Sequence, residues 1–161
     1  MLGNPTQPNY ADVRQELERV AADKGVTLLP TFEARRPEEV EPALDRIAKD
    51  KPQALMVLVH ALFVLHRKRI VAFAAQAKVP AMHGFTEDVE AGGLMAFAVE
   101  TRTLYARAPV FVDKILKGAK PGDIPIEQPT RFGLWINLKT ARALGVTIPP
   151  AVLVRAERVI E

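Results

Sequence analysis

Apolar residues follow two alternating periods along this chain. Short apolar runs of strand length occupy 26–32, 54–59, 79–83, 94–98 and 132–138. Between these runs, apolar residues recur at the three- and four-residue spacing of an amphipathic helix. The helical stretches are 10–24, one opened by Pro37, one that ends at Lys78, 103–117, a short one that ends at Leu144, and 151–160. This alternation predicts an α/β fold with a doubly wound, mostly parallel sheet.

Several segments carry more specific signals. The run 54–59 is apolar on both faces, which is typical of a central parallel strand covered by helices on each side. Asn9 stands in the capping position of the first helix, Asp12 favours its positive end, and Gly25 ends it. We expect the apolar sides of the first two helices to pack on the sheet. Those sides consist of Tyr10, Val13, Leu17, Val20 and Ala21, and of Val40, Ala43, Leu44 and Ile47.

Composition excludes some classes of protein. The 161 residues, 48% of them hydrophobic and 25% charged, suit one globular domain with a core. No apolar stretch approaches the ~18 residues that span a bilayer. The net charge of +3 is too small to require nucleic acid or anionic lipid as a partner. The absence of cysteine excludes disulfides and thiol chemistry, and it is compatible with either the cytosol or the periplasm.

Catalytic, cofactor and metal motifs are lacking. The three histidines, His60, His66 and His83, include no close pair at the spacing of zinc ligands. The chain has no Gly-x-Ser-x-Gly, no P-loop and no Gly-x-Gly-x-x-Gly, so we expect no cofactor, no metal and no catalytic residue. We interpret the carboxylates Glu87, Asp88 and Glu90, before two glycines, as a solvated turn, and the basic run 66–69 as a solvated helix face.

Three loops qualify as a binding site, because open α/β sheets bind ligands at the carboxyl ends of their strands. They are 4–9, 60–63 and 84–88. Their candidate ligand contacts are Asn4, Thr6, Gln7, Asn9, His60, Phe63, Phe85 and Thr86. Polar side chains fill the first loop, the imidazole of His60 can hydrogen-bond a solute, and the rings of Phe63 and Phe85 can form a wall. Each loop also has a purely structural interpretation, as a turn shaped by Asn and Pro, a loop histidine, or a turn with one buried ring.

Three blocks of sequence point to a family. Gly-Asn-Pro-Thr-Gln-Pro-Asn at 3–9, Gly-Phe-Thr-Glu-Asp-Val-Glu-Ala-Gly-Gly-Leu-Met at 84–95, and the run from Val112 to Pro150 stand in its order and spacing. Together they resemble the substrate-binding proteins of ABC importers for aromatic amino acids (tryptophan and tyrosine type), which have the type I periplasmic-binding-protein fold. The resemblance covers nearly the whole chain and corresponds to the C-terminal portion of such a protein.

The resemblance implies a division of the chain. Residues 1–92 correspond to the second-lobe α/β domain without its first strand, 93–120 to a strand and helix that cross to a missing first lobe, and 121–161 to a return strand and C-terminal helices. The strand before Asn4 would lie near the middle of the sheet, and each buried amide left unpaired there costs ~1 to 3 kcal/mol. We therefore expect rearrangement, strand exchange or a homodimer through the surfaces that the missing lobe leaves.

The resemblance also implies a non-catalytic function. Such a protein closes two lobes around a small organic solute and delivers it to an importer permease. Phe97 joins the candidate ligand contacts here, because relatives have Ser-Tyr-Gly where this chain has Ala96-Phe97-Ala98. Many relatives carry an acidic or small polar residue where this chain has His60. Both departures indicate an altered ligand specificity.

Two questions stay open at this point. The family implies the periplasm, whereas Met1-Leu2 before Gly3 supply no signal peptide, so the chain as written would stay in the cytoplasm. The alternative function is a small α/β enzyme or a cytosolic regulatory domain that reuses the lobe. Its polar centre would be His60, Glu87 and Asp88.

Overall fold

A short strand formed by the first residues of the chain joins two sheets. A computed structural model describes residues 1–99, 101–129 and 131–161. In it β1 (Leu2–Gly3) pairs in parallel with β2 (Phe32–Glu33). A second sheet has the order β3 (Leu55–Met56), β4 (Ala81–His83), β5 (Met95–Ala98), β6 (Gly133–Asn137) and β7 (Ala156–Ile160). A bridge from Leu2 to Val57 joins the two sheets. The β5–β6 pair is antiparallel and the other pairs are parallel, which confirms the predicted fold class.

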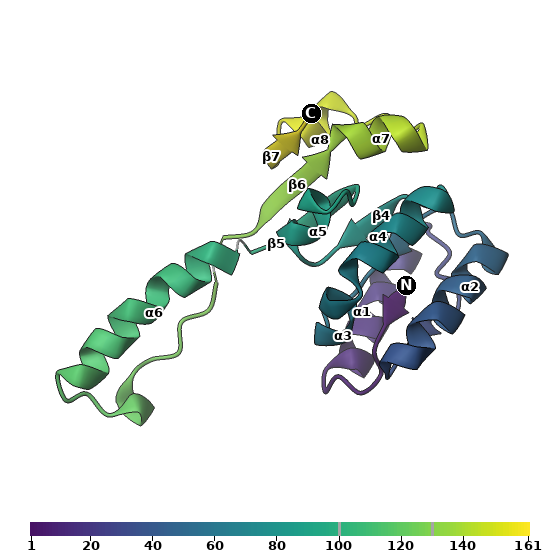
Figure 1. Ribbon diagram of the computed structural model, residues 1–161. Coiled ribbons are helices and arrows are strands. Elements are labelled where there is room, and N and C mark those ends of the chain that lie inside the picture. Colours follow the sequence, from purple (N-terminus) through teal and green to yellow (C-terminus); the bar gives the residue numbers. More distant parts are fainter. Residues whose placement is uncertain (100, 130) are drawn as a thin grey trace.

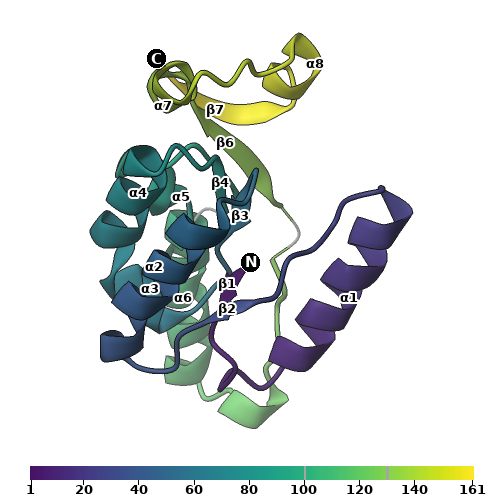
Figure 2. The ribbon, with the colours of Figure 1, turned by 90° about the vertical axis from the view of Figure 1, so that its right-hand side faces the viewer.

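Helices lie on both sides of this sheet. They are α1 (Tyr10–Asp23), α2 (Val40–Asp50), α3 (Ala61–Leu65), α4 (Arg67–Gln76), α5 (Thr86–Glu90), α6 (Thr101–Leu116), α7 (Leu138–Leu144) and α8 (Pro150–Leu153), with 3-10 turns at Pro37–Glu39 and Pro121–Asp123. Figure 2 shows α1 on one side of β1 and β2, and α2 with α3 on the other. The helix predicted to end at Lys78 is in fact the pair α3 and α4, separated at His66.

The main core lies between the first strands and α2 to α4. The apolar positions predicted for α2, which are Val40, Ala43, Leu44 and Ile47, are all buried. They pack with Leu2, Phe32 and Leu55 from three adjacent strands. The helix ends at Lys51, which has a left-handed backbone (φ 45°). The spacing of apolar residues therefore fixed the buried face of α2 correctly.

The residues just before Asn4 form a strand in the middle of the sheet. The amide of Phe32 donates to Met1 O (2.9 Å) and that of Leu58 donates to Leu2 O (3.0 Å). Met1–Gly3 thus lies between β2 and β3, where the sequence analysis expected no strand. The side chain of Leu2 is fully buried, so this short strand also contributes to the core.

Three sequence predictions are wrong in part. The run 26–31 is not a strand, and Val26 is 59% exposed. Asn9 precedes α1 but its side chain makes no capping hydrogen bond. The apolar face expected to pack α1 on the sheet is buried only at Tyr10, and Val20 is exposed. Few contacts hold this helix, because the strand that should lie beneath it is reduced to Phe32–Glu33.

The end of the chain is a strand, whereas a helix was predicted over 151–160. The helix α8 stops at Leu153, and β7 then pairs in parallel with β6. Pairing with β7 satisfies the edge of β6, which would otherwise leave backbone groups free. Arg158 also lies over the ring of Trp135, with 4.8 Å between the guanidinium carbon and the ring centroid. These nonlocal gains outweigh the weak helical pattern of the segment.

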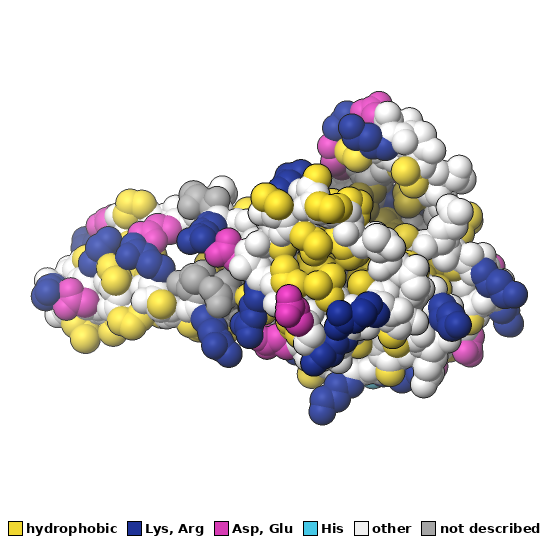
Figure 3. Space-filling view, turned by 90° about the horizontal axis from the view of Figure 1, so that it is seen from above, with side chains coloured by type: hydrophobic (Ala, Val, Ile, Leu, Met, Phe, Trp, Pro, Cys, Tyr) yellow, Lys and Arg dark blue, Asp and Glu magenta, His cyan; other side chains and the backbone are white. Residues whose placement is uncertain are grey.

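The helix α6 projects away from the rest of the molecule (Figure 1). Large apolar side chains are exposed along it, and Pro109 lies within it. They are Leu104, Tyr105, Val110, Val112, Ile115 and Leu116. Figure 3 shows apolar side chains along this arm interspersed with charged ones. The helix therefore presents more apolar surface than a lone solvated helix requires.

The α2 packing gives a first testable prediction. Leu44→Ala should lower the free energy of unfolding by about 2 to 5 kcal/mol, because Leu44 is 1% exposed and its loss leaves a cavity. Leu116→Ala is the matched control, since Leu116 is 82% exposed and should change stability by less than about 0.5 kcal/mol. Urea unfolding followed by circular dichroism measures both. Equal losses in the two variants would show that α2 does not form the core.

Candidate functional site

Three loops leave the carboxyl ends of neighbouring parallel strands. The strands β1, β3 and β4 lie side by side, and they lead into the loops that begin at Asn4, His60 and Gly84. These are the loops that the sequence analysis selected. Because all three strands run in the same direction, the loops emerge at one edge of the sheet, where open α/β proteins bind ligands.

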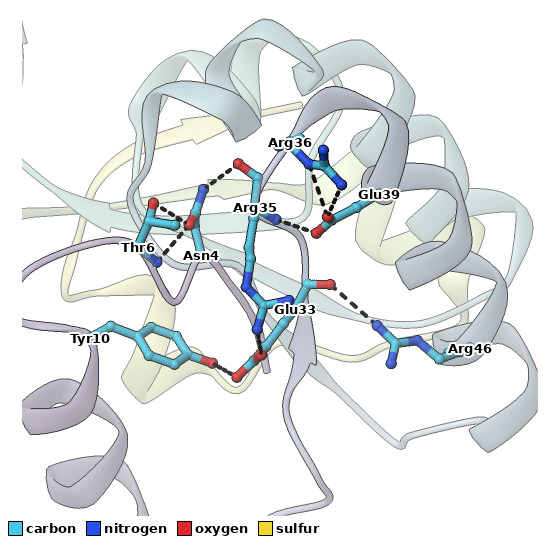
Figure 4. Close-up of polar contacts among 8 residues, drawn as sticks. All are labelled: Asn4, Thr6, Tyr10, Glu33, Arg35, Arg36, Glu39 and Arg46. Carbon is cyan, nitrogen blue, oxygen red and sulfur yellow. Dashed lines mark hydrogen bonds and ion pairs between the residues drawn. The ribbon is translucent and has the colours of Figure 1, made fainter.

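The amide of Asn4 holds this edge together (Figure 4). Its Nδ2 donates to Arg35 O (3.3 Å) and lies 3.4 Å from His60 Nδ1. Its Oδ1 accepts from the backbone N–H of Thr6 (2.9 Å) and from Thr6 Oγ1 (2.7 Å). An amide offers two donor protons and two acceptor lone pairs, and these contacts use all four. Asn4 is 1% exposed, so it supports the loops from beneath.

His60 begins α3 and faces the first loop. Its Nδ1 accepts a hydrogen bond from the backbone N–H of Leu62 (3.1 Å), which caps this short helix. The ring meets Phe63 edge to face, with 6.0 Å between the ring centroids. Phe63 is 4% exposed and belongs to the core, so its ring fixes the base of the loop.

One pocket brings two of the candidate loops together. The residues that line it come from the segment after β3, from α3 and α4, and from the stretch that runs from the end of β4 into α5. They are Val57, Leu58, Phe63, Val64, Arg67, Ile70, His83, Gly84, Phe85 and Asp88. Phe63 and Phe85 therefore line one small pocket, whose volume of about 10 Å³ is the space of a single water molecule, so a larger group would lie over its mouth. The loop from Asn4 reaches this region through its contact with His60.

A buried charged cluster lies against this pocket. Arg67 Nε is 2.5 Å from Asp88 Oδ1, and His83 Nδ1 is 3.7 Å from Asp88 Oδ2. Burial lowers the pKa of His83, the charge of Asp88 raises it, and the charge of Arg67 lowers it again. Burial is the largest of these effects, so the ring stays neutral at neutral pH. His83 Nε2 is buried and has no hydrogen-bond partner among the residues that the structure describes.

The sequence analysis missed this cluster. It interpreted Asp88 as part of a solvated turn and Arg67 as part of a solvated helix face, whereas Asp88 lies in α5 and is 7% exposed. The neighbouring Lys68, Arg69 and Glu90 are exposed, as expected. Gly93 was the available signal, because a Cβ there would lie 3.1 Å from His83 Nε2 and 2.8 Å from Asp88 O. A glycine needed for close approach indicates that something bulky is packed against it.

A second polar group surrounds the end of β2. Tyr10 Oη donates to Glu33 Oε1 (3.1 Å), and Arg35 Nη2 lies 3.3 Å from Glu33 Oε2 (Figure 4). Burial raises the pKa of Tyr10, so the phenol keeps its proton and donates. The backbone N–H of Arg35 donates to Glu39 (2.8 Å). These contacts fix the loop whose carbonyl accepts from Asn4, and the sequence analysis did not select any of them.

The remaining candidate residues are spread over different places. Thr6 and Asn9 are exposed and Gln7 is half-buried. Thr86 is 4% exposed, and its hydroxyl donates to Glu87 Oε2 (3.3 Å). Phe97 is 55% exposed, does not line the pocket, and stacks on Phe132 with 5.7 Å between the ring centroids.

Comparison with known proteins identifies the family. A family model for ABC transporter substrate binding proteins matches residues 1–160. The chain belongs to this family. No curated protein matches it. Among solved structures, a conserved domain protein from Vibrio cholerae O1 biovar El Tor is 28% identical, with a TM-score of 0.86 over 98% of this chain and 53% of that one.

Two further solved structures are similar. An ABC domain from Streptococcus pneumoniae in complex with L-Trp is also 28% identical, with a TM-score of 0.86 over 99% of this chain and 53% of that one. A ligand-free, open substrate binding protein from Clostridium difficile is 19% identical, with a TM-score of 0.67 over 99% of this chain and 52% of that one, and it supports the fold alone. The chain thus spans about half the length of each of these three structures.

The ion pair beside the pocket should be essential for stability in this family member. Arg67→Met leaves the Asp88 carboxylate buried without a partner, and we expect unfolding to become easier by about 2 to 3 kcal/mol. Arg67 keeps 23% side-chain exposure, which places the loss toward the low side for buried pairs. In the double variant Arg67→Met/Asp88→Asn most of the loss should be recovered, since no charge is then stranded. The measurement is urea unfolding at neutral pH.

Arg69→Met serves as the control. Arg69 also pairs with a carboxylate, that of Glu41, but both side chains are largely exposed (44% and 54%). Solvent screens this pair, so its loss should leave the unfolding midpoint close to that of the wild type. If Arg67→Met behaves like Arg69→Met, the pair beside the pocket is not a buried one.

His83 makes the stability of the chain depend on pH. Its pKa in the folded protein is lowered from the ordinary value of 6.5. As the pH falls below about 6.5, His83 becomes protonated in the unfolded chain while it stays neutral in the folded chain. The free energy of unfolding therefore decreases. His83→Gln should flatten this decline, whereas His66→Gln should not. Thermal melts between pH 5 and 8 test this, and a wild type that becomes more stable toward pH 5 would contradict it.

Proposed function

We propose that this chain forms half of the solute cleft of an ABC importer's substrate-binding protein, and that its solute is an aromatic amino acid. The observation that carries the proposal is the shared pocket of Phe63 and Phe85, at the edge where the loops of β1, β3 and β4 emerge. Two rings beside a polar loop suit a solute with one aromatic end and one charged end. The similar structure from Streptococcus pneumoniae, which is in complex with L-Trp, supports the choice of solute.

The contacts with the solute are assigned by position. We propose His60 and Phe85 as the inner contacts, with Phe63 (4% exposed) as the apolar base beneath them. We propose Thr6, Gln7 and Asn9 as residues of the rim, with Thr86 (4% exposed) beneath it. Asn4 belongs to the site as the support of these loops, because its own polar atoms are already engaged. We propose Phe97, which is exposed and lies beside Phe132, as a contact that forms only when the cleft is complete.

The cleft is completed by a first lobe. We propose that 1–92 are second-lobe α/β domain, that 93–120 cross to the first lobe, and that 121–161 return. The projection of α6, its exposed apolar side chains and the antiparallel return of β6 beside β5 support this division. The similar structures contain about as much chain again as this one covers, which is enough for such a lobe.

The partners follow from the same proposal. We propose delivery of the solute to an importer permease, and the periplasm as the compartment. No helix in the described part of the chain is long and apolar enough to cross a membrane. Where α6 has no first lobe to cover it, a second copy of the chain can bury the same apolar surface, and a homodimer or strand exchange is then expected.

No contact favours the enzyme as a second function. Asp88 is engaged by Arg67, and no hydrogen bond or ion pair in the described residues joins His60 to Glu87 or Asp88. Within the described residues, His60 instead contacts Asn4 and Leu62.

Solute binding tests the proposal. We expect saturable binding of L-tryptophan, L-tyrosine or L-phenylalanine to the purified chain by calorimetry, and no binding of glycerol. Affinity should be weak, because half a cleft encloses less of the ligand. Phe85→Ala should weaken it about tenfold by removing a ring contact. Val154→Ala, at a position that is 86% exposed and lies outside both α6 and the pocket, is the control.

Light scattering of the same samples reports the assembly. A dimer that the amino acid stabilises would mean that two copies complete one cleft, while a monomer that binds would mean that one lobe suffices. A chain that binds none of the three aromatic amino acids would contradict the proposed function, whatever its oligomeric state.

A further inference from the structure

The two ring nitrogens of His60 have different surroundings. Nδ1 accepts from the backbone N–H of Leu62 at 3.1 Å and lies 3.4 Å from the Asn4 amide nitrogen, which can only donate. No hydrogen bond joins Nε2 to any residue within 1–99, 101–129 and 131–161. The one unpartnered side-chain polar atom that is buried in those ranges belongs to His83, so Nε2 of His60 is open to solvent.

We infer that Asn4 and Leu62 hold neutral His60 in the tautomer that carries its proton on Nε2, and that this N–H donates to a carboxylate oxygen of the solute. Two N–H donors converge on Nδ1, which leaves no room for a proton there. The proton of the neutral ring must then be on Nε2, at the accessible side of the loop. His60 is thereby a specificity-determining residue, because it offers a donor where a carboxylate in its place would offer only acceptors.

The orientation of the Asn4 amide is itself fixed. Its Oδ1 accepts from both the N–H and the hydroxyl of Thr6, so the NH₂ group is turned toward Arg35 O and His60. A reversed amide would place its oxygen against the carbonyl of Arg35 and its NH₂ group against the N–H of Thr6, so two like groups would face each other at each end. Thr6 therefore orients the amide of Asn4, and this amide in turn determines which nitrogen of His60 carries the proton that the solute accepts.

The inference rests on the proposed function for its ligand, and the tautomer can be tested without one. In ¹⁵N-histidine-labelled chain, at a pH about two units above the ordinary histidine pKa of ~6.5, long-range ¹H–¹⁵N spectra distinguish the two nitrogens. His60 should show the pattern of an Nε2–H ring. In Asn4→Asp, a carboxylate faces Nδ1 and the proton should move to Nδ1 or the ring should gain a second one. Gln15→Glu adds the same charge on exposed α1 and should leave the His60 pattern unchanged.

The contact with the solute has its own test. His60→Gln keeps an N–H donor near the position of Nε2, whereas His60→Leu has none. We expect His60→Leu to weaken L-tryptophan binding about tenfold and His60→Gln to weaken it by less than about threefold. Tryptamine, which lacks the carboxylate, should not distinguish His60→Leu from the wild type. Thermal melts of each variant check that it is folded.

The outcomes separate the two proposals. A wild-type spectrum with the proton on Nδ1, or with both tautomers equally populated, would overturn the inference even if L-tryptophan binds. Equal affinity of His60→Leu and the wild type for L-tryptophan would overturn the contact with the carboxylate. If the wild-type chain binds no amino acid, the proposed function and the ligand of His60 both fail, while the spectrum still decides the tautomer.

Discussion

The geometry of the candidate site depends on one buried amide, that of Asn4. Its donors reach the loop after β2 and the loop after β3, and its acceptor holds the turn after β1. Those segments are 31 and 56 residues away along the chain, so the contacts are tertiary. Buried polar groups cost stability unless they are paired. Because this amide is fully paired, any displacement of one loop breaks a contact in the others, and the loops are held as a unit.

The strands at this edge are short, and the packing of α2 against them supplies stability that backbone pairing alone would not. β1, β2 and β3 have two residues each, too few to be stable through backbone pairing alone. The apolar face of α2 covers them, and its regular spacing made that part of the fold predictable from the sequence. The Ala156–Ile160 strand was not predictable in this way, because it forms only through pairing with β6, whose paired residues lie 22 or 23 positions earlier in the chain. The strand expected over 26–32 is not formed over 26–31 because only Phe32–Glu33 pairs with a neighbouring strand.

The candidate site was predictable where it depends on loop position. His60, Phe63 and Phe85 follow strands, and the rule that ligands lie at the carboxyl ends of strands selects them. Arg67, His83 and Asp88 could not be selected, because nothing in a run of charges tells which side chain turns inward. Asn4 was selected as a ligand contact, which stays a prediction, and its structural role as a support of the loops was not foreseen. Sequence shows that an amide stands in a loop, but only coordinates show that all its hydrogen-bonding capacity is used within the protein.

Polar side chains and two aromatic rings lie at one edge of the sheet, and α6 projects away from the rest of the molecule, where we propose that a first lobe completes the cleft. Chemical-shift mapping of ¹⁵N-labelled chain titrated with L-tryptophan tests this most directly. The account predicts that the shifted amides cluster in the loops at 6–9, 60–63 and 84–86, with those of α2 and β7 unmoved. Shifts confined to α6 or to the β6–β7 end, or no shifts at saturating L-tryptophan, would contradict it.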